Sequence, residues 1–168
     1  MEESKAVALI ALIAEAIANA HDLAVVHLDI KPSNILMDTK GAPVVADFGI
    51  AEMTDSSASL SGAMMTPQYA APERFNDVDP NPAADVYALG ATLFALLAGR
   101  PPFATKENTS PAAVMTRVIQ EPVPLDELPD IISDPVRDLL LRAMSKICLL
   151  YTSPSPRDQR GSRMPSSA

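Results

Sequence analysis

Apolar positions along the chain gather into stretches with helical character. Residues 4–20 combine strong helix formers with apolar side chains around most of the circumference, so this helix is expected to be buried. Residues 83–98 are apolar on all sides, which predicts a central buried helix. Residues 111–120 and 134–146 predict two amphipathic helices. The fold is therefore expected to be mainly α.

Two short apolar runs interrupt this helical pattern. Residues 35–37 and 44–46 flank a turn at residues 38–43, whose sequence is rich in turn formers. The arrangement predicts a small β-hairpin, which gives an α+β class with little strand. Such a hairpin would bring Asp47 back beside Asn34. Residues 52–64, rich in Ser, Thr, Ala and Gly, predict a mobile surface loop.

Polar residues concentrate between the first helix and the hairpin. Asp29, Lys31 and Asn34 lie within the segment VHLDIKPSN at residues 26–34, and Asp47 follows the second short strand. A base, a cation, an amide oxygen and a carboxylate are the parts that phosphoryl transfer from a magnesium nucleotide requires. Any one of these residues alone would be interpreted as a turn residue. All four in register favour a catalytic site.

Three motifs in this order resemble the bacterial, eukaryotic-like Ser/Thr protein kinases. HLDIKPSN at residues 27–34 resembles their catalytic loop, DFG at residues 47–49 their magnesium-binding motif, and APE at residues 71–73 the end of their activation segment. Three motifs in this order and at this spacing are stronger evidence for that family than any single motif would be. The resemblance extends over about residues 6–146. It implies a protein-kinase-like C-terminal lobe.

The resemblance assigns a role to each polar residue. Asp29 would be the catalytic base that accepts the proton of the substrate hydroxyl, and Lys31 would balance charge on the transferring phosphoryl group of ATP. Asn34 and Asp47 would hold Mg²⁺, so the implied cofactors are ATP and Mg²⁺. Thr66 resembles the threonine that bonds the catalytic aspartate and lysine, and it favours protein Ser/Thr hydroxyls as acceptors.

Four further residues are implied as structural support. His27 and Phe48 would pack together under the magnesium loop, and Asp85 would anchor the catalytic loop. Glu73 would pair with an arginine that this chain lacks near its end. Leu28 departs from the family, because many kinases have there the arginine that receives an activation-loop phosphate. Control by loop phosphorylation is therefore not expected.

The sequence before His27 holds no glycine-rich loop and no strand lysine with a helix glutamate partner. The resemblance also ends near Lys146. Residues 1–147 are therefore expected to be a partial kinase domain in which the N-terminal β-rich lobe is absent. The parent protein would be an ATP-dependent Ser/Thr protein kinase, whereas this chain alone is expected to be inactive. A small-molecule phosphotransferase of the aminoglycoside kind and a non-catalytic pseudokinase are the alternatives.

The last residues have a different character from the rest. Residues 148–168 lack any period and are rich in Ser and Pro. Residues 148–158 and 162–168 can be encoded by strings that resemble the two ends of a sequencing adapter. A natural disordered tail is the alternative. We expect this segment to be non-native, disordered and without effect on the fold.

Composition and charge limit the classes of molecule that this chain is expected to bind. The formal net charge of −8 argues against nucleic acid and anionic membranes. The single cysteine, Cys148, excludes a disulfide framework. The apolar run at residues 6–14 follows more acidic than basic residues, which disfavours a signal peptide, and it is too short to span a bilayer. A cytoplasmic location is expected, with any membrane tether of the parent outside this chain.

Overall fold

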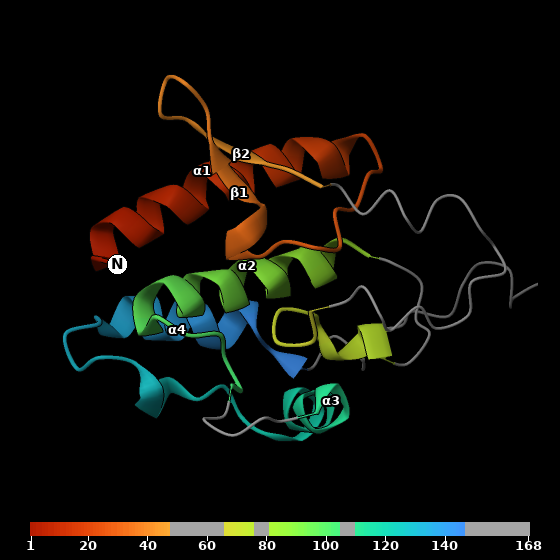
Figure 1. The fold of residues 1–168 in the computed structure, drawn as a ribbon, viewed down its shortest axis with the longest axis vertical. Helices are drawn as coiled ribbons and strands as arrows, with labels where there is room; N and C mark the ends of the chain where they lie inside the picture. Colours follow the sequence, from red (N-terminus) through yellow and green to blue (C-terminus); the bar gives the residue numbers. More distant parts are fainter. Residues whose placement is uncertain (48–65, 76–80, 105–109, 147–168) are drawn as a thin grey trace, which may run out of the picture.

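The computed structural model describes residues 1–47, 66–75, 81–104 and 110–146. Within these ranges, helix α2 runs through the middle of the molecule and packs against α1 on one side and α4 on the other (Figure 1). A small antiparallel hairpin, β1 and β2, lies against α1. The elements are α1 (Glu3–Asp22), β1 (Ile35–Met37), β2 (Pro43–Val45), α2 (Pro82–Ala98), α3 (Pro111–Gln120) and α4 (Asp134–Ala143), with 3₁₀ turns η1 (Pro32–Asn34), η3 (Pro72–Phe75) and η4 (Leu125–Glu127). The mainly helical class with one small hairpin is confirmed.

Helix α2 is the centre of the core because its sequence is apolar on every side. The Asn81 side chain accepts a hydrogen bond from the amide of Ala83 at 2.9 Å and so caps its start. Gly99 ends it in the left-handed region, with φ at +74°. Gly90 allows α4 to come close, since a Cβ there would lie 2.9 Å from the Cβ of Ala143. The predicted burial of this helix is confirmed, and its predicted boundaries are correct within one residue.

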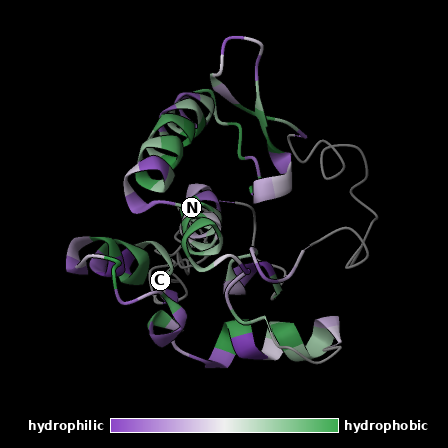
Figure 2. Cartoon of the chain, turned by 60° about the vertical axis from the view of Figure 1, so that its left-hand side comes forward, coloured by the Kyte–Doolittle hydropathy of each residue, from purple (hydrophilic) through white to green (hydrophobic). Residues whose placement is uncertain are grey.

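Helix α1 is buried along one face only. Ala6, Ile10, Ile13 and Ile17 face the core, whereas Leu12 is 54% exposed. The expectation of burial was therefore wrong for the other faces of α1, because within the described residues α2, the hairpin and the start of α4 contact only part of this helix. Figure 2 shows hydrophobic residues over much of this helix, the one beside the hairpin. By length and composition alone, α1 could also cross a membrane.

The hairpin forms where the short apolar runs predicted it. Strand β1 pairs antiparallel with β2, and Leu36 lies opposite Val44. Asp38 stabilises the turn, because its carboxylate accepts hydrogen bonds from the amides of Lys40 at 2.7 Å and Ala42 at 2.8 Å. The register returns the chain to the start of β1, just before Asp47.

A contact between the two ends of the described chain closes the fold. The Glu3 carboxylate accepts hydrogen bonds from the amide and the hydroxyl of Ser133, both at 2.7 Å. Ser133 is the residue that precedes α4, and its own side chain does not cap that helix. Glu3 therefore places a negative charge at the positive N-terminal end of α4. This contact joins the first turns of α1 and α4.

Helix α4 ends earlier than its periodicity predicted, at Ala143 instead of residue 146. Met144 leaves the helix but stays fully buried in the core. Lys146 then lies over the Phe103 ring, 5.0 Å from its centroid, and its ammonium donates to the carbonyl oxygen of Glu121. These contacts draw the chain toward α3 and away from a further helical turn. The expectations for residues 52–64 and 148–168 fall outside the described residues and stay predictions.

Candidate active site

Asp85, in the first turn of α2, is the buried anchor of the candidate site. Its carboxylate is fully buried and accepts hydrogen bonds from the amides of His27 and Leu28, each at 2.8 Å. The ring Nε2 of His21 lies 2.8 Å from the same carboxylate. A buried carboxylate requires such partners, since burial without them costs several kcal/mol. Asp85 thus occupies the anchoring position that the family resemblance implied.

The two accepted amides fix a sharp change of direction in the chain. Leu28 has φ of +68°, in the left-handed region that a residue with a Cβ enters at a cost of roughly 1–2 kcal/mol. The hydrogen bond from the Leu28 amide to Asp85 helps to offset this cost. The turn directs the next residue, Asp29, toward Lys31 and Asn34.

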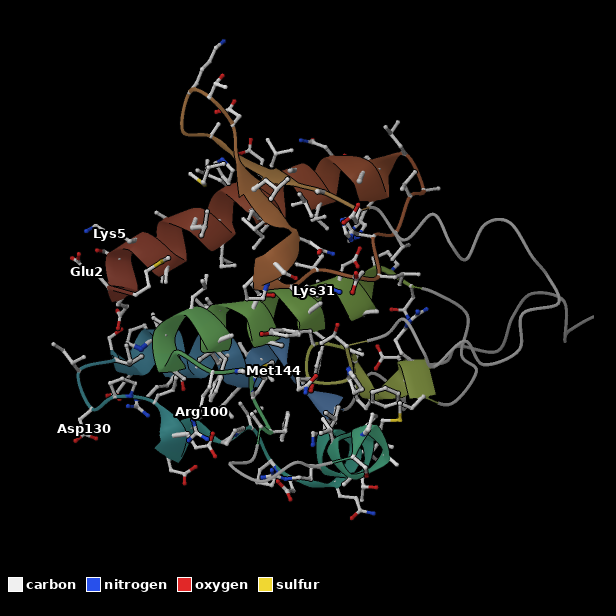
Figure 3. The ribbon with its side chains drawn as sticks, viewed as in Figure 1. Glu2, Lys5, Lys31, Arg100, Asp130 and Met144 are labelled. Atoms are coloured by element: carbon white, nitrogen blue, oxygen red, sulfur yellow. The ribbon has the colours of Figure 1, made fainter. Side chains whose placement is uncertain are left out.

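Asp29, Lys31 and Asn34 form one hydrogen-bonded cluster. The Lys31 ammonium lies 2.9 Å and 2.8 Å from the two Asp29 carboxylate oxygens. The Asn34 amide group donates to the Asp29 carboxylate and to its backbone carbonyl, both at 2.9 Å. Lys31 also donates to the Thr66 hydroxyl at 3.1 Å, so the segment before η3 reaches the cluster. Lys31 lies between the hairpin and α2 (Figure 3).

The short 3₁₀ turn η1 explains why these residues meet. Pro32 begins the turn, and steric clash with its ring holds the preceding Lys31 in an extended conformation. Asn34 at the end of the turn is therefore directed back to Asp29. Within the loop, this turn brings the three polar residues together, as their spacing predicted.

Asp47 is near the cluster without touching it. The amide of Ala46 donates to the backbone carbonyl of Asn34 at 2.8 Å, which places the end of the hairpin beside the cluster. The Asp47 side chain is exposed, and no hydrogen bond or ion pair joins it to Asp29, Lys31 or Asn34 among the described residues. The predicted convergence is therefore seen for three residues, while Asp47 approaches only through its neighbour.

The oxygen atoms at this place suit magnesium. Donation from the Asn34 amide nitrogen to Asp29 fixes the orientation of that amide, so its oxygen remains an acceptor. Asp47 offers an exposed carboxylate nearby. In the described ranges no three His, Cys, Asp or Glu residues gather into a self-sufficient metal site. Mg²⁺ commonly binds one or two protein oxygens together with substrate phosphates and water, so the Asn34 and Asp47 pair fits that mode.

His27 lies fully buried beneath the cluster. Its ring Nδ1 accepts a hydrogen bond from the amide of Asp29 at 3.3 Å. Burial lowers the pKa of His27 below its ordinary value, against the opposing effects of the Asp85 charge and the Ala46 backbone. The neutral ring therefore suits this place. Phe48, its expected packing partner, lies outside the described residues.

Stability is expected to fall with acid in two stages. His27 has a lowered pKa in the folded chain, so the unfolded chain binds the extra proton first, and stability is lost as the pH falls below about 6.5. Hydrogen bonds from Ser133 lower the pKa of Glu3, so a second loss follows as the pH falls below 4.5. Urea unfolding followed by circular dichroism across this range measures both.

The two stages can be separated by substitution. Glu3→Gln should remove the lower stage and leave the stage below pH 6.5 intact, because His27 is unchanged. Lys5→Ala, an exposed change in the same helix, should leave both stages of stability loss unchanged. A flat stability curve between neutral pH and pH 4.5 would contradict the assignment to His27.

Glu73 is buried in η3, at 5% exposure. No described basic residue forms an ion pair with it. Burial raises the pKa of Tyr87 in α2, and the nearby charge of Glu73 raises it further. The expectation that Glu73 lacks its family arginine concerns the end of the chain outside the described residues, so it stays a prediction.

His21 is the residue of the site that the sequence did not reveal. It lies in the last turn of α1, where a basic residue is also explained by the helix dipole. Only its contact with Asp85, distant in sequence, connects it to the catalytic loop. No local pattern could have predicted that contact.

Comparison with known proteins adds the decisive observation. The family model described as "Protein kinase domain" matches residues 1–148, which is most of the chain. The chain belongs to the protein kinase family. The catalytic-loop and anchor geometry described above thus lies within a kinase domain.

Several curated kinases are similar to this one. Serine/threonine-protein kinase PkaB of Streptomyces coelicolor is 38% identical over 136 residues, covering 74% of this chain and 32% of PkaB. Serine/threonine-protein kinase PknF of Mycobacterium tuberculosis is 35% identical over 147 residues, covering 82% of this chain and 30% of PknF. Serine/threonine-protein kinase PknK of Mycobacterium bovis is 36% identical over 113 residues, covering 67% of this chain and 10% of PknK. This kinase chain therefore spans about a third or less of these relatives.

Proposed function

We propose that this chain supplies the catalytic loop and acceptor side of a Ser/Thr protein kinase, which transfers the γ-phosphate of ATP to a hydroxyl of a protein substrate. The observation that carries the proposal is the cluster in which Lys31 and Asn34 both bond the Asp29 carboxylate. The names of the relatives support protein Ser/Thr as the acceptor class. We also propose a cytoplasmic location.

The chemistry follows from the positions of the side chains. Asp29 accepts the proton of the acceptor hydroxyl while that oxygen forms its bond to the γ-phosphorus and the bond to the β-phosphate oxygen breaks, which releases ADP. Lys31 holds Asp29 in place and offers positive charge to the transferring group. Magnesium–ATP, when bound, supplies the phosphoryl group and neutralises charge. Asn34 and Asp47 would hold the metal, and Thr66 positions Lys31.

Asp29 is 31% exposed and Lys31 18% exposed, so a substrate hydroxyl can reach the cluster. A positioned base of this kind contributes about 10²–10⁴-fold to a rate. The relatives named above are Ser/Thr protein kinases, which favours this class over a small-molecule phosphotransferase. The intact Asp29, Lys31, Asn34 and Asp47 disfavour a pseudokinase.

Metal and nucleotide binding by the full chain tests the site. With Mn²⁺ and ADP added, we expect paramagnetic broadening of the Asn34 side-chain amide signals in an NMR spectrum, because Asn34 and Asp47 hold the ion. Asp47→Ala should remove most of the broadening. Asp130→Ala, an exposed and distant aspartate, is the matched control and should leave it unchanged. Equal broadening in both variants would overturn the metal assignment.

We further propose that this chain alone transfers no phosphate. All six glycines of the sequence follow the catalytic loop, so the chain itself offers no glycine-rich loop to cover the nucleotide phosphates. A radiolabelled transfer assay with a basic protein substrate should give the same background for the full chain and for Asp29→Ala. Transfer well above background that Asp29→Ala abolishes would overturn this part of the proposal.

A further inference from the structure

We infer that His21 is a positioning residue for the catalytic loop, acting through the Asp85 carboxylate on the backbone that carries Asp29. The inference rests on the proposed function, because Asp29 is the catalytic group that is positioned. It adds a role for α1, whose last turn carries His21.

Three donors converge on one buried carboxylate. One oxygen of Asp85 accepts the Leu28 amide, and the other accepts both the His27 amide and the His21 ring nitrogen, all at 2.8 Å. Asp85 is fully buried and the His21 side chain is only 18% exposed. Water therefore has little access with which to replace the imidazole.

The third donor matters because a carboxylate rotates easily about its last torsion, which has no sharp staggered minima. Two consecutive amides can be accepted together only when the carboxylate plane has one orientation. The two amides alone leave the second oxygen with room for another donor, and His21 fills it. His21 therefore adds a side-chain donor that keeps the carboxylate in the orientation that the two amides require.

This orientation is transmitted to Asp29 through the backbone. Leu28 keeps its left-handed φ of +68° while its amide is bonded to Asp85. The next amide, that of Asp29, donates to the His27 ring at 3.3 Å. A loosened Asp85 carboxylate would free Leu28 to relax toward ordinary φ, and Asp29 would turn away from Lys31.

A role of His21 as a simple tie between α1 and α2 is less well supported. The apolar face of Ile10, Ile13 and Ile17 already packs α1 on the core. The contact of His21 is instead directed at the one carboxylate that holds the loop. Because that carboxylate only accepts, the His21 Nε2 must carry a hydrogen.

The test compares His21→Leu and His21→Gln in the full chain. Leucine fills similar space without a donor, whereas the glutamine amide nitrogen can reach the position of Nε2. In His21→Leu we expect hydrogen exchange at the Leu28 amide to accelerate about tenfold or more, because a charge-assisted bond is lost. The amide of Leu93, in the buried centre of α2, serves as the internal reference and should keep its rate.

Rescue separates positioning from packing. His21→Gln should restore slow exchange at Leu28, and long-range ¹H–¹⁵N spectra of the unsubstituted chain should show the Nε2–H tautomer of His21. Equal acceleration at Leu28 and Leu93, no rescue by glutamine, or an Nδ1–H tautomer would each overturn the inference. These readouts need no nucleotide. A chain that meets them while Mn²⁺ and ADP leave Asn34 unaffected would support the role of His21 and overturn the metal-site proposal.

Discussion

Replacement of Asp85 by alanine is expected to remove about 3–5 kcal/mol from the free energy of unfolding, a large part of the 5–15 kcal/mol typical of a domain. The carboxylate is fully buried and receives the His27 and Leu28 amides and the His21 ring. Alanine leaves these donors without their acceptor in a buried place, and each unpaired donor costs about 1–3 kcal/mol. Urea unfolding followed by circular dichroism measures the loss.

Asp134→Ala is the matched control for Asp85→Ala. Asp134 also lies in the first turn of a helix, α4, but its side chain is exposed. The Asp134→Ala variant should lose only the stabilisation from the helix dipole, which contributes below about 1 kcal/mol to the free energy of unfolding. Similar losses in the two variants would mean that helix-end electrostatics, and not the buried hydrogen bonds, account for the role of Asp85.

Phe103→Ala is expected to cost about 3–5 kcal/mol, because the ring is fully buried and its removal leaves a cavity. Phe103 also joins α3 to the core, since its carbonyl accepts a hydrogen bond from Arg117 at 2.9 Å and its ring lies under Lys146. Thermal and urea unfolding both report the loss.

The control for Phe103 is Ile119→Ala on α3, where the side chain is 40% exposed. A loss below about 1 kcal/mol is expected there, because little apolar surface returns to water. If Phe103→Ala proved as mild as Ile119→Ala, α3 would be held by other contacts than this ring.

The sequence predicted those parts of the fold that depend on local pattern. The all-apolar residues 83–98 became the buried helix α2, and the short runs around the turn at residues 38–43 became the hairpin. Asp29, Lys31 and Asn34 met because a 3₁₀ turn brings near neighbours together. The predicted positions of all four helices were also correct, with an error of three residues at the end of α4.

The remaining features depend on contacts that no local pattern contains. The bond between Glu3 and Ser133 joins residues 130 positions apart, and His21 meets Asp85 across 64 positions. The one-sided burial of α1 likewise depends on which elements surround it, and the residue types alone predicted more burial. The position of Asp47 relative to Asn34 is set by the hairpin register, which the sequence indicated only in part.

The long-range anchoring of the catalytic loop has a consequence for how the chain folds during synthesis. The loop is made before its anchor, because Asp85 follows His27 by 58 residues, and the partner of Glu3 follows later still. Until α2 leaves the ribosome, the apolar face of α1 cannot pack on it, so a chain stalled there would be a substrate for chaperones. Non-local contacts also slow folding, because chain entropy is lost before the contacts form. The catalytic loop is thus synthesised before its anchor and takes its final conformation only after α2 has been made.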